Sequence, residues 1–185
     1  TRLTSGWSGT AYSTGAISSS NSPRRLRAPD LYSMARSAIS SNARGATTSL
    51  ARVGPLKVIT DGSLGTRTAA CSHAYPGDPH NHGMLTVDPE TLVELMTRAT
   101  GAGLACAIHA IGDVANSHAL DAFSATGAWG TIEHAQLVAH ADIPRFARLG
   151  VGASVQPEHA IDDRDLTDSI WADQTALPYP LRALA

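Results

Sequence analysis

A lone histidine at the end of an apolar run, followed at once by a helix signal, is the feature that most restricts how this chain folds. The apolar run covers residues 104–108, and Gly112 and Asp113 then open the amphipathic segment 114–123. His109 therefore lies at the carboxyl end of a predicted buried strand, directly before a helix. Parallel α/β proteins carry their chemistry at this position.

The same pattern returns one strand later. Residues 131–134 form a predicted strand that ends in His134, and a turn and the segment 142–149 follow it. A third strand, 151–155, leads into Gln156. Two histidines one strand–helix period apart suggest metal ligands. The alternative is that each histidine caps its strand and bonds a neighbouring backbone group.

An earlier strand, 56–60, carries Lys57 inside an apolar run. The alternative to an inward-pointing lysine is an edge strand from which Lys57 reaches solvent. The long loop 69–83 should overhang the site. A helix should begin at Asp88-Pro89, where a capping residue precedes proline. Its predicted inward face consists of apolar residues at helical spacing: Leu92, Leu95, Met96 and Ala99.

Repeated strand–helix units predict either an open doubly wound parallel sheet or a (β/α)₈ barrel. The chain has no Gly-x-Gly-x-x-Gly after a strand and no Gly-Lys-Ser/Thr loop, so no nucleotide-phosphate site is indicated. Metal-type side chains gather at the predicted strand ends. This clustering favours the barrel.

Charge divides the chain at about residue 52. Residues 1–52 hold seven arginines and one acid, whereas residues 53–185 hold seven basic and fifteen acidic side chains. We expect 1–52 to be a poorly ordered Ser/Arg-rich segment with a short helix from Asp30 to Ile39, and 53–185 to be the ordered domain. The arginines lie among serines with few aromatic residues, so we expect no nucleic-acid partner.

Hydrophobic residues make up 43% of the 185, enough to fill a core, and no apolar run approaches the roughly 20 residues that span a bilayer. We therefore expect no membrane partner. The two cysteines, Cys71 and Cys106, form no Cys-x-x-Cys pair. This usage favours a reducing, cytoplasmic location.

Four motifs, taken in order, resemble the amidohydrolase superfamily, and within it the family-3 branch that includes the N-substituted formamide deformylases. They are PLKVITDGSLGTRTA at 55–69, HAIGD at 109–113, IEHAQ at 132–136 and SVQPEH at 154–159. The resemblance covers residues 53–185. It implies a (β/α)₈ barrel with one or two divalent metals, expected to be zinc, at the carboxyl ends of its strands. It also implies a metal-activated hydroxide that hydrolyses carbon–nitrogen bonds of non-peptide amides.

The resemblance implies that Lys57, His109 and His134 are both catalytic residues and metal ligands. Lys57 matches a lysine that can be carboxylated to a bridging carbamate, and the two histidines match a ligand pair. An apolar strand suits such a lysine, because desolvation favours the neutral amine that reacts with carbon dioxide. All three residues end parallel strands, so we expect them to converge at one end of the sheet.

Five further residues are assigned to a supporting shell: Asp61, Asp113, Glu133, Gln156 and His159. Metal-bound imidazoles usually donate their second nitrogen to a carboxylate or carbonyl, and we expect Asp113 and Glu133 to fill that role. The alternative for Asp113 is a helix cap.

Two features of the family are missing. Its first strand ends in His-x-His, and the only such pair here, His80-Asn81-His82, lies in a loop after Lys57, so we interpret it as unrelated to the site. The aspartate of the eighth strand should follow Ala185. We therefore expect roughly strands four to seven, an isolated chain that is inactive, and the rest of the barrel or a second copy as partner, with a small amide-type substrate. The alternatives are a barrel phosphoesterase and a non-enzymatic α/β domain acting through a partner chain.

Overall fold

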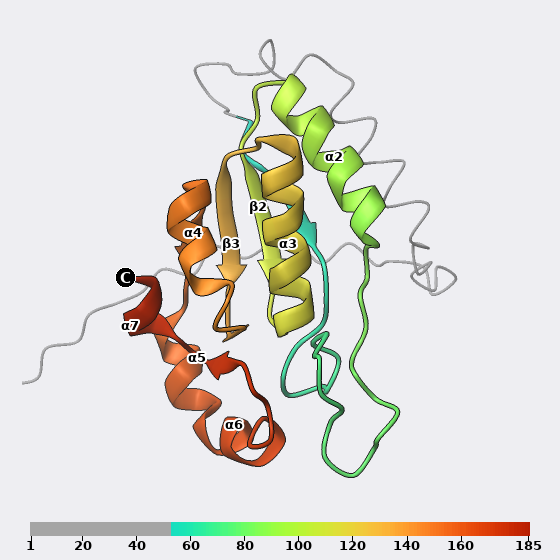
Figure 1. The fold of residues 1–185 in the computed structure, drawn as a ribbon, viewed down its shortest axis with the longest axis vertical. Coiled ribbons are helices and arrows are strands. Elements are labelled where there is room, and N and C mark those ends of the chain that lie inside the picture. Colours follow the sequence, from blue (N-terminus) through green and yellow to red (C-terminus); the bar gives the residue numbers. More distant parts are fainter. Residues whose placement is uncertain (1–52) are drawn as a thin grey trace, which may run out of the picture.

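A four-stranded parallel sheet lies at the centre of the computed structural model, which describes residues 53–185 (Figure 1). In spatial order the strands are β1 (Leu56–Ile59), β2 (Cys106–Ala110), β3 (Gly130–His134) and β5 (Gly152–Ser154). The register sets Ile59, His109 and Glu133 side by side across three strands. The alternation of parallel strands and helices predicted from the sequence is therefore present. The expected disorder of residues 1–52 and the expected helix from Asp30 to Ile39 lie outside the described residues.

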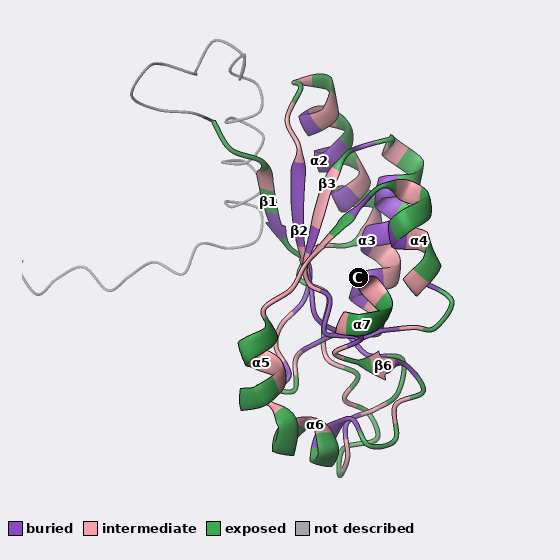
Figure 2. Cartoon of the chain, turned by 90° about the vertical axis from the view of Figure 1, so that its left-hand side faces the viewer, coloured by how far each residue is buried: buried purple, intermediate pink, exposed green. Residues whose placement is uncertain are grey.

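Three helices pack on one face of this sheet (Figure 2). They are α2 (Pro89–Gly101), α3 (Asp113–Thr126) and α4 (Ile143–Leu149). As predicted, Asp88 caps α2, since its side chain accepts a hydrogen bond of 2.8 Å from the backbone N–H of Thr91, and Pro89 follows it. The predicted inward face of α2 is the buried one.

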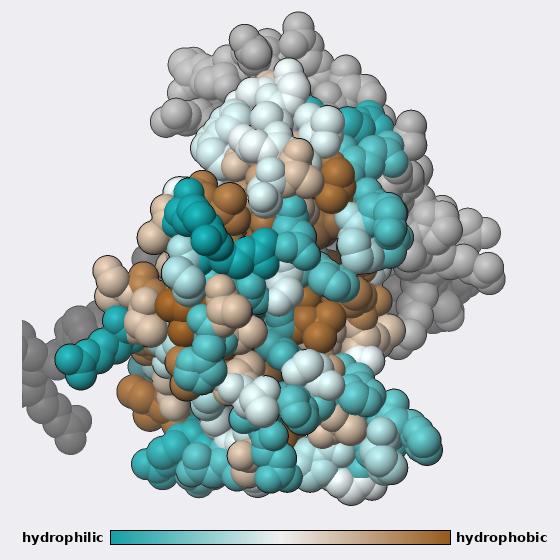
Figure 3. All heavy atoms as spheres, viewed as in Figure 1, coloured by the Kyte–Doolittle hydropathy of each residue, from teal (hydrophilic) through white to brown (hydrophobic). Residues whose placement is uncertain are grey.

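The main core lies between the sheet and these helices. Val58, Ile108 and Ile132 point from three neighbouring strands toward the helices, where α3 supplies Leu120 and Phe123. Figure 3 shows the outward side of the helical layer, where hydrophilic side chains are interspersed with smaller hydrophobic groups. None of the helices within residues 53–185 has the length and apolar character needed to cross a membrane.

Alternate strand residues point away from the helices, onto the second face of the sheet. Lys57, Ile59, His109 and Glu133 share this face by register. Ile59, the last residue of the edge strand β1, is 56% exposed although its side chain is apolar. Within residues 53–185, the helices that pack on the strands are all on the other side (Figure 2).

The remaining elements gather at the carboxyl ends of the strands (Figure 1). They are the loop that follows β1, β4 (Leu137–Val138), α5 (Pro157–Asp162), α6 (Arg164–Ile170), β6 (Leu177–Pro178) and α7 (Leu181–Leu184). β4 and β6 pair antiparallel. A second buried cluster, which includes Tyr75, Leu137 and Trp171, holds this layer together.

Candidate functional site

Three histidine rings lie next to one another where β2, β3 and β5 end. The ring centroids of His109 and His134 are 4.6 Å apart, and the two planes meet at 68°. On its other side His134 stacks on His159, the third residue of α5, with centroids 5.6 Å apart and planes only 10° from parallel. The sequence predicted that the first two would converge, and the structure brings them together.

The backbone at the end of β3 explains how His134 reaches His109. In the sheet His134 pairs with Ala110, which points into the core, so regular alternation would turn the histidine toward the helices. Instead, His134 and Ala135 take left-handed conformations with φ of 74° and 45°. Such conformations are costly for residues other than glycine and occur often at functional sites. The strand ends here, and the ring of His134 lies beside that of His109.

Burial favours the neutral form of both histidines. Burial, and to a smaller extent the neighbouring His109 and His159, lower the pKa of His134 to about 4. Burial also lowers the pKa of His109. Nδ1 of His134 is buried and has no hydrogen-bond partner among the described residues. A neutral imidazole is the form that binds a metal ion.

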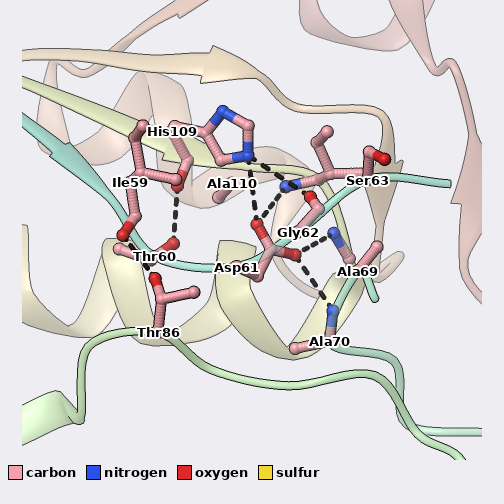
Figure 4. Close-up of polar contacts among 12 residues, drawn as sticks. Ile59, Thr60, Asp61, Gly62, Ser63, Ala69, Ala70, Thr86, His109 and Ala110 are labelled. Carbon is pink, nitrogen blue, oxygen red and sulfur yellow. Dashed lines mark hydrogen bonds and ion pairs between the residues drawn. The ribbon is translucent and has the colours of Figure 1, made fainter. Parts of the chain in front are cut away.

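Nε2 of His109 contacts two neighbouring oxygen atoms (Figure 4). It lies 3.4 Å from the carbonyl oxygen of Gly62 and 3.5 Å from Oδ1 of Asp61. Nδ1 is therefore the nitrogen that His109 presents to the site. Burial raises the pKa of Asp61 to about 6, against the opposing effect of the backbone N–H groups that it accepts.

The surroundings of Lys57 differ from those expected. An apolar, desolvated environment was predicted, yet the side chain of Lys57 is 47% exposed. The physical reason is that β1 is an edge strand of the described sheet, and its second face is uncovered. Nζ of Lys57 lies 3.8 Å from Oε2 of Glu133, on the same face of the sheet as His109. Lys57 thus faces the site while remaining half exposed, as the edge-strand alternative predicted.

Glu133 is held by its own strand and the next one. It accepts hydrogen bonds from the hydroxyls of Thr131 and Ser154, the latter at 3.1 Å. It therefore orients Lys57 within the described residues, whereas the sequence predicted that it would orient a histidine.

The other supporting residues contact backbone groups. Asp113 accepts a hydrogen bond of 2.9 Å from the backbone N–H of Ser72, so it ties α3 to the loop after β1 and bonds neither a histidine nor the N-terminus of its own helix. Gln156 donates to the carbonyl of Ser154 at 3.0 Å, while its buried Oε1 has no partner among residues 53–185.

The pair His80 and His82 stays in the loop where the sequence placed it. His80 is exposed, and Nδ1 of His82 lies 3.3 Å from the carbonyl oxygen of Cys71. Across residues 53–185, no group of three or more His, Cys, Asp or Glu side chains is arranged to hold a metal ion. The site assembled by the described residues therefore centres on the pair His109 and His134, with Lys57 on the same face.

Sequence reasoning missed Gln136. This side chain is 3% exposed, and its Nε2 lies 3.1 Å from Nδ1 of His159. A polar amide in the apolar stretch after His134 was the available signal, because a buried amide needs partners.

Several known proteins are similar to this chain in sequence. A model of the amidohydrolase family matches residues 22–185, so the match begins before the motif-bearing range 53–185. In Arabidopsis thaliana, the protein LONG AFTER FAR-RED 3 is 41% identical over 120 residues, which cover 61% of this chain and 21% of the relative. In Bacillus subtilis (strain 168), YtcJ, an amidohydrolase by name, is 35% identical over 114 residues, which cover 60% of this chain and 22% of the relative. The chain thus spans about a fifth of the length of these curated relatives.

Two crystal structures of uncharacterized metal-dependent hydrolases share the fold. The protein from Pyrococcus furiosus matches with a TM-score of 0.70 and 32% identity, over 83% of this chain and 33% of its own. The protein from Pyrococcus horikoshii OT3 matches with a TM-score of 0.72 and 35% identity, over 83% of this chain and 32% of its own. With a family model that matches most of its length, the chain belongs to the amidohydrolase family.

Proposed function

We propose that residues 53–185 supply part of the active site of a metal-dependent hydrolase that cleaves carbon–nitrogen bonds other than peptide bonds. Membership of the amidohydrolase family and the similarity to metal-dependent hydrolases support the hydrolase class. The observation that carries the proposal is the pair His109 and His134. Their rings are 4.6 Å apart at the ends of adjacent parallel strands, and burial lowers the pKa of both.

The donor set fits a divalent metal ion. Neutral imidazoles are favoured ligands of zinc, and burial favours the neutral form of both His109 and His134. We assign His109 and His134 as ligands from this chain, with Lys57 as a third candidate on the same face. Further ligands would come from outside the described residues. When bound, one or two such ions supply Lewis acidity that activates water and polarises a carbonyl group.

The open face of the sheet supports a place within a (β/α)₈ barrel. Side chains that point to the centre of a barrel are covered by the opposite strands. Here Lys57, Ile59 and His109 lie on a face that no described helix packs against, and Ile59 is 56% exposed. We assign the four parallel strands to one half of such a barrel, roughly its strands four to seven.

Each residue of the site has a distinct task in this proposal. Asp61 and Gly62 hold Nε2 of His109, so that Nδ1 is directed into the site. Glu133 holds the ammonium group of Lys57. A carbamate would form when the neutral amine of Lys57 adds carbon dioxide and releases a proton, and this step replaces the ion pair with Glu133.

The test uses the full-length protein encoded by the gene, purified with and without added zinc. We expect bound zinc by elemental analysis, and hydrolysis of N-formyl amines and simple amides in preference to phosphate esters. His109→Ala and His134→Ala should each lose metal and activity. His140→Ala is the matched control, because His140 is an exposed imidazole outside the site. Wild-type protein without metal, or variants that match His140→Ala in activity, would contradict the proposal.

A second candidate is a non-enzymatic domain that acts through a partner chain. The exposed Ile59 and the uncovered sheet face favour it. Under this alternative, substitution of His109 leaves the function unchanged, whereas Ile59→Asp abolishes assembly with the partner. Analytical ultracentrifugation of the two variants separates the alternatives.

A further inference from the structure

We propose that His159 is a positioning residue for His134: its ring stacks on the ring of His134 and fixes the orientation of that ligand, while Gln136 anchors His159 from behind. The role as a ligand's support rests on the proposed function. The stacking itself is a property of this chain and does not depend on that function.

The ring of His134 lies between two other imidazoles. The edge-on contact with His109 at 4.6 Å and the offset parallel contact with His159 at 5.6 Å are both within the range of favourable aromatic pairs. Two rings of different orientation leave little freedom for rotation of the His134 side chain. The left-handed backbone at His134 and Ala135 fixes the direction in which the His134 side chain leaves the main chain.

Hydrogen bonding does not provide this constraint. Metal-bound imidazoles usually have a carboxylate or carbonyl on the second nitrogen, and His109 has both in Asp61 and Gly62. By contrast, Nδ1 of His134 is buried without a hydrogen-bond partner among residues 53–185. Within the described chain, ring contacts are therefore the interactions that orient His134.

Gln136 explains why His159 stays in place. The amide group of Gln136 donates from Nε2 to Nδ1 of His159 over 3.1 Å, which puts the proton of a neutral His159 ring on Nε2. Gln136 is itself buried, and its backbone carbonyl oxygen accepts a hydrogen bond from the backbone N–H of Tyr179. The chain of contacts runs from the segment after β3, through Gln136, to α5 and back to His134.

Two substitutions of His159 distinguish the effect of the stacked ring from the effect of its nitrogen atoms. His159→Phe keeps a flat ring that can stack, and His159→Ala removes it. In the 185-residue chain without metal, two-dimensional NMR of the imidazole groups reports the tautomer and the ring-proton shifts of His134. We expect His159→Ala to change both, and His159→Phe to leave one tautomer dominant as in the wild type. Unchanged His134 signals in His159→Ala would overturn the proposal.

The second arm measures zinc affinity of the full-length protein by calorimetry. We expect His159→Ala to weaken binding about 10-fold, within the range for residues that orient ligands, and His159→Phe to stay within about threefold of wild type, because the stacked ring remains. Gln136→Leu should give an intermediate loss, and His140→Ala none. Equal losses in His159→Phe and His159→Ala would show that a nitrogen of His159 is required, and would overturn the stacking role. If the wild type binds no zinc, the proposed function fails, and the NMR arm still decides the role of His159.

Discussion

Oδ1 of Asp61 lies 3.5 Å from Nε2 of His109, at the point where the chain leaves β1 (Figure 4). The same carboxylate is 1% exposed and accepts backbone N–H bonds from Ala70, Ile111 and Gly112 at 3.0, 3.0 and 2.8 Å. One side chain therefore joins the loop after β1 to the turn between β2 and α3, and places that assembly against a histidine of the site.

Replacing Asp61 should destabilise this region strongly. Asp61→Ala leaves three buried N–H groups without their acceptor, and each such group costs about 1–3 kcal/mol when it stays unpaired. Because water can enter part of the space, we expect a loss of about 2–4 kcal/mol in the free energy of unfolding. Urea denaturation measures it. Asp121→Ala is the control, because Asp121 is an exposed carboxylate, and it should change stability by less than about 1 kcal/mol. Equal effects of the two substitutions would contradict this role for Asp61.

The turn held by Asp61 also depends on Gly112. A Cβ at this position would lie 1.9 Å from the carbonyl oxygen of Ala70, which is backbone and cannot rotate away. We expect Gly112→Ala to lower the thermal midpoint by several degrees, because about 1–3 kcal/mol is typical of forced overpacking. Gly101→Ala is the matched control, since a Cβ there has no atom within 4 Å and alanine favours the helix. It should be neutral or slightly stabilising, and a larger loss there than at Gly112 would count against the steric argument.

Local patterns were sufficient to predict the scaffold. The apolar runs that end at His109 and His134, and the capping signal at Asp88-Pro89, each depend on neighbours in sequence, and the strands and helix they predict are present. Parallel order brings the strand ends together, but the contact between the two rings also depends on the left-handed backbone at His134 and Ala135, which no sequence pattern indicated.

Contacts between distant segments could not be predicted in this way. Nothing local indicates that Asp113 bonds Ser72, or that Gln136 holds His159, because these contacts depend on how loops pack after the sheet forms. The apolar neighbours of Lys57 in β1 left both a buried and an exposed lysine open, and the desolvated environment implied by the family resemblance is not found, since the side chain is 47% exposed. Burial of an edge strand is decided by what covers the sheet, and the strand's own residues carry no information about that.

Alkaline pH should reveal the burial of Cys71. Burial raises the pKa of this thiol from 9.0 to about 11, so the folded state favours its neutral form. The stabilising contribution is fully present below pH 9 and is lost as the pH rises through about 11. The difference between the two pKa values corresponds to about 3 kcal/mol. Urea denaturation from pH 8 to pH 11 should show the stability difference between wild type and Cys71→Ala shrinking by up to that amount. Cys106→Ala should behave alike, because burial raises the pKa of Cys106 to about 11 as well. A pH-independent difference would contradict the assignment.

Lys57 should matter for activity and hardly at all for stability. Its side chain is 47% exposed and its ion pair with Glu133 spans 3.8 Å, a geometry that contributes at most about 1 kcal/mol. In the full-length protein, we therefore expect Lys57→Ala to unfold at nearly the wild-type urea concentration and to lose amide hydrolysis. If a carbamate on Lys57 is the reason, short carboxylic acids should restore part of the activity, because they can occupy the space of the lost group. Lys57→Arg sharpens the test: it keeps the positive charge beside Glu133 and cannot accept carbon dioxide in the same way, so it should be as inactive as the alanine variant. Full activity in Lys57→Arg would show that Lys57 acts through its charge alone, and would exclude it from the metal ligands.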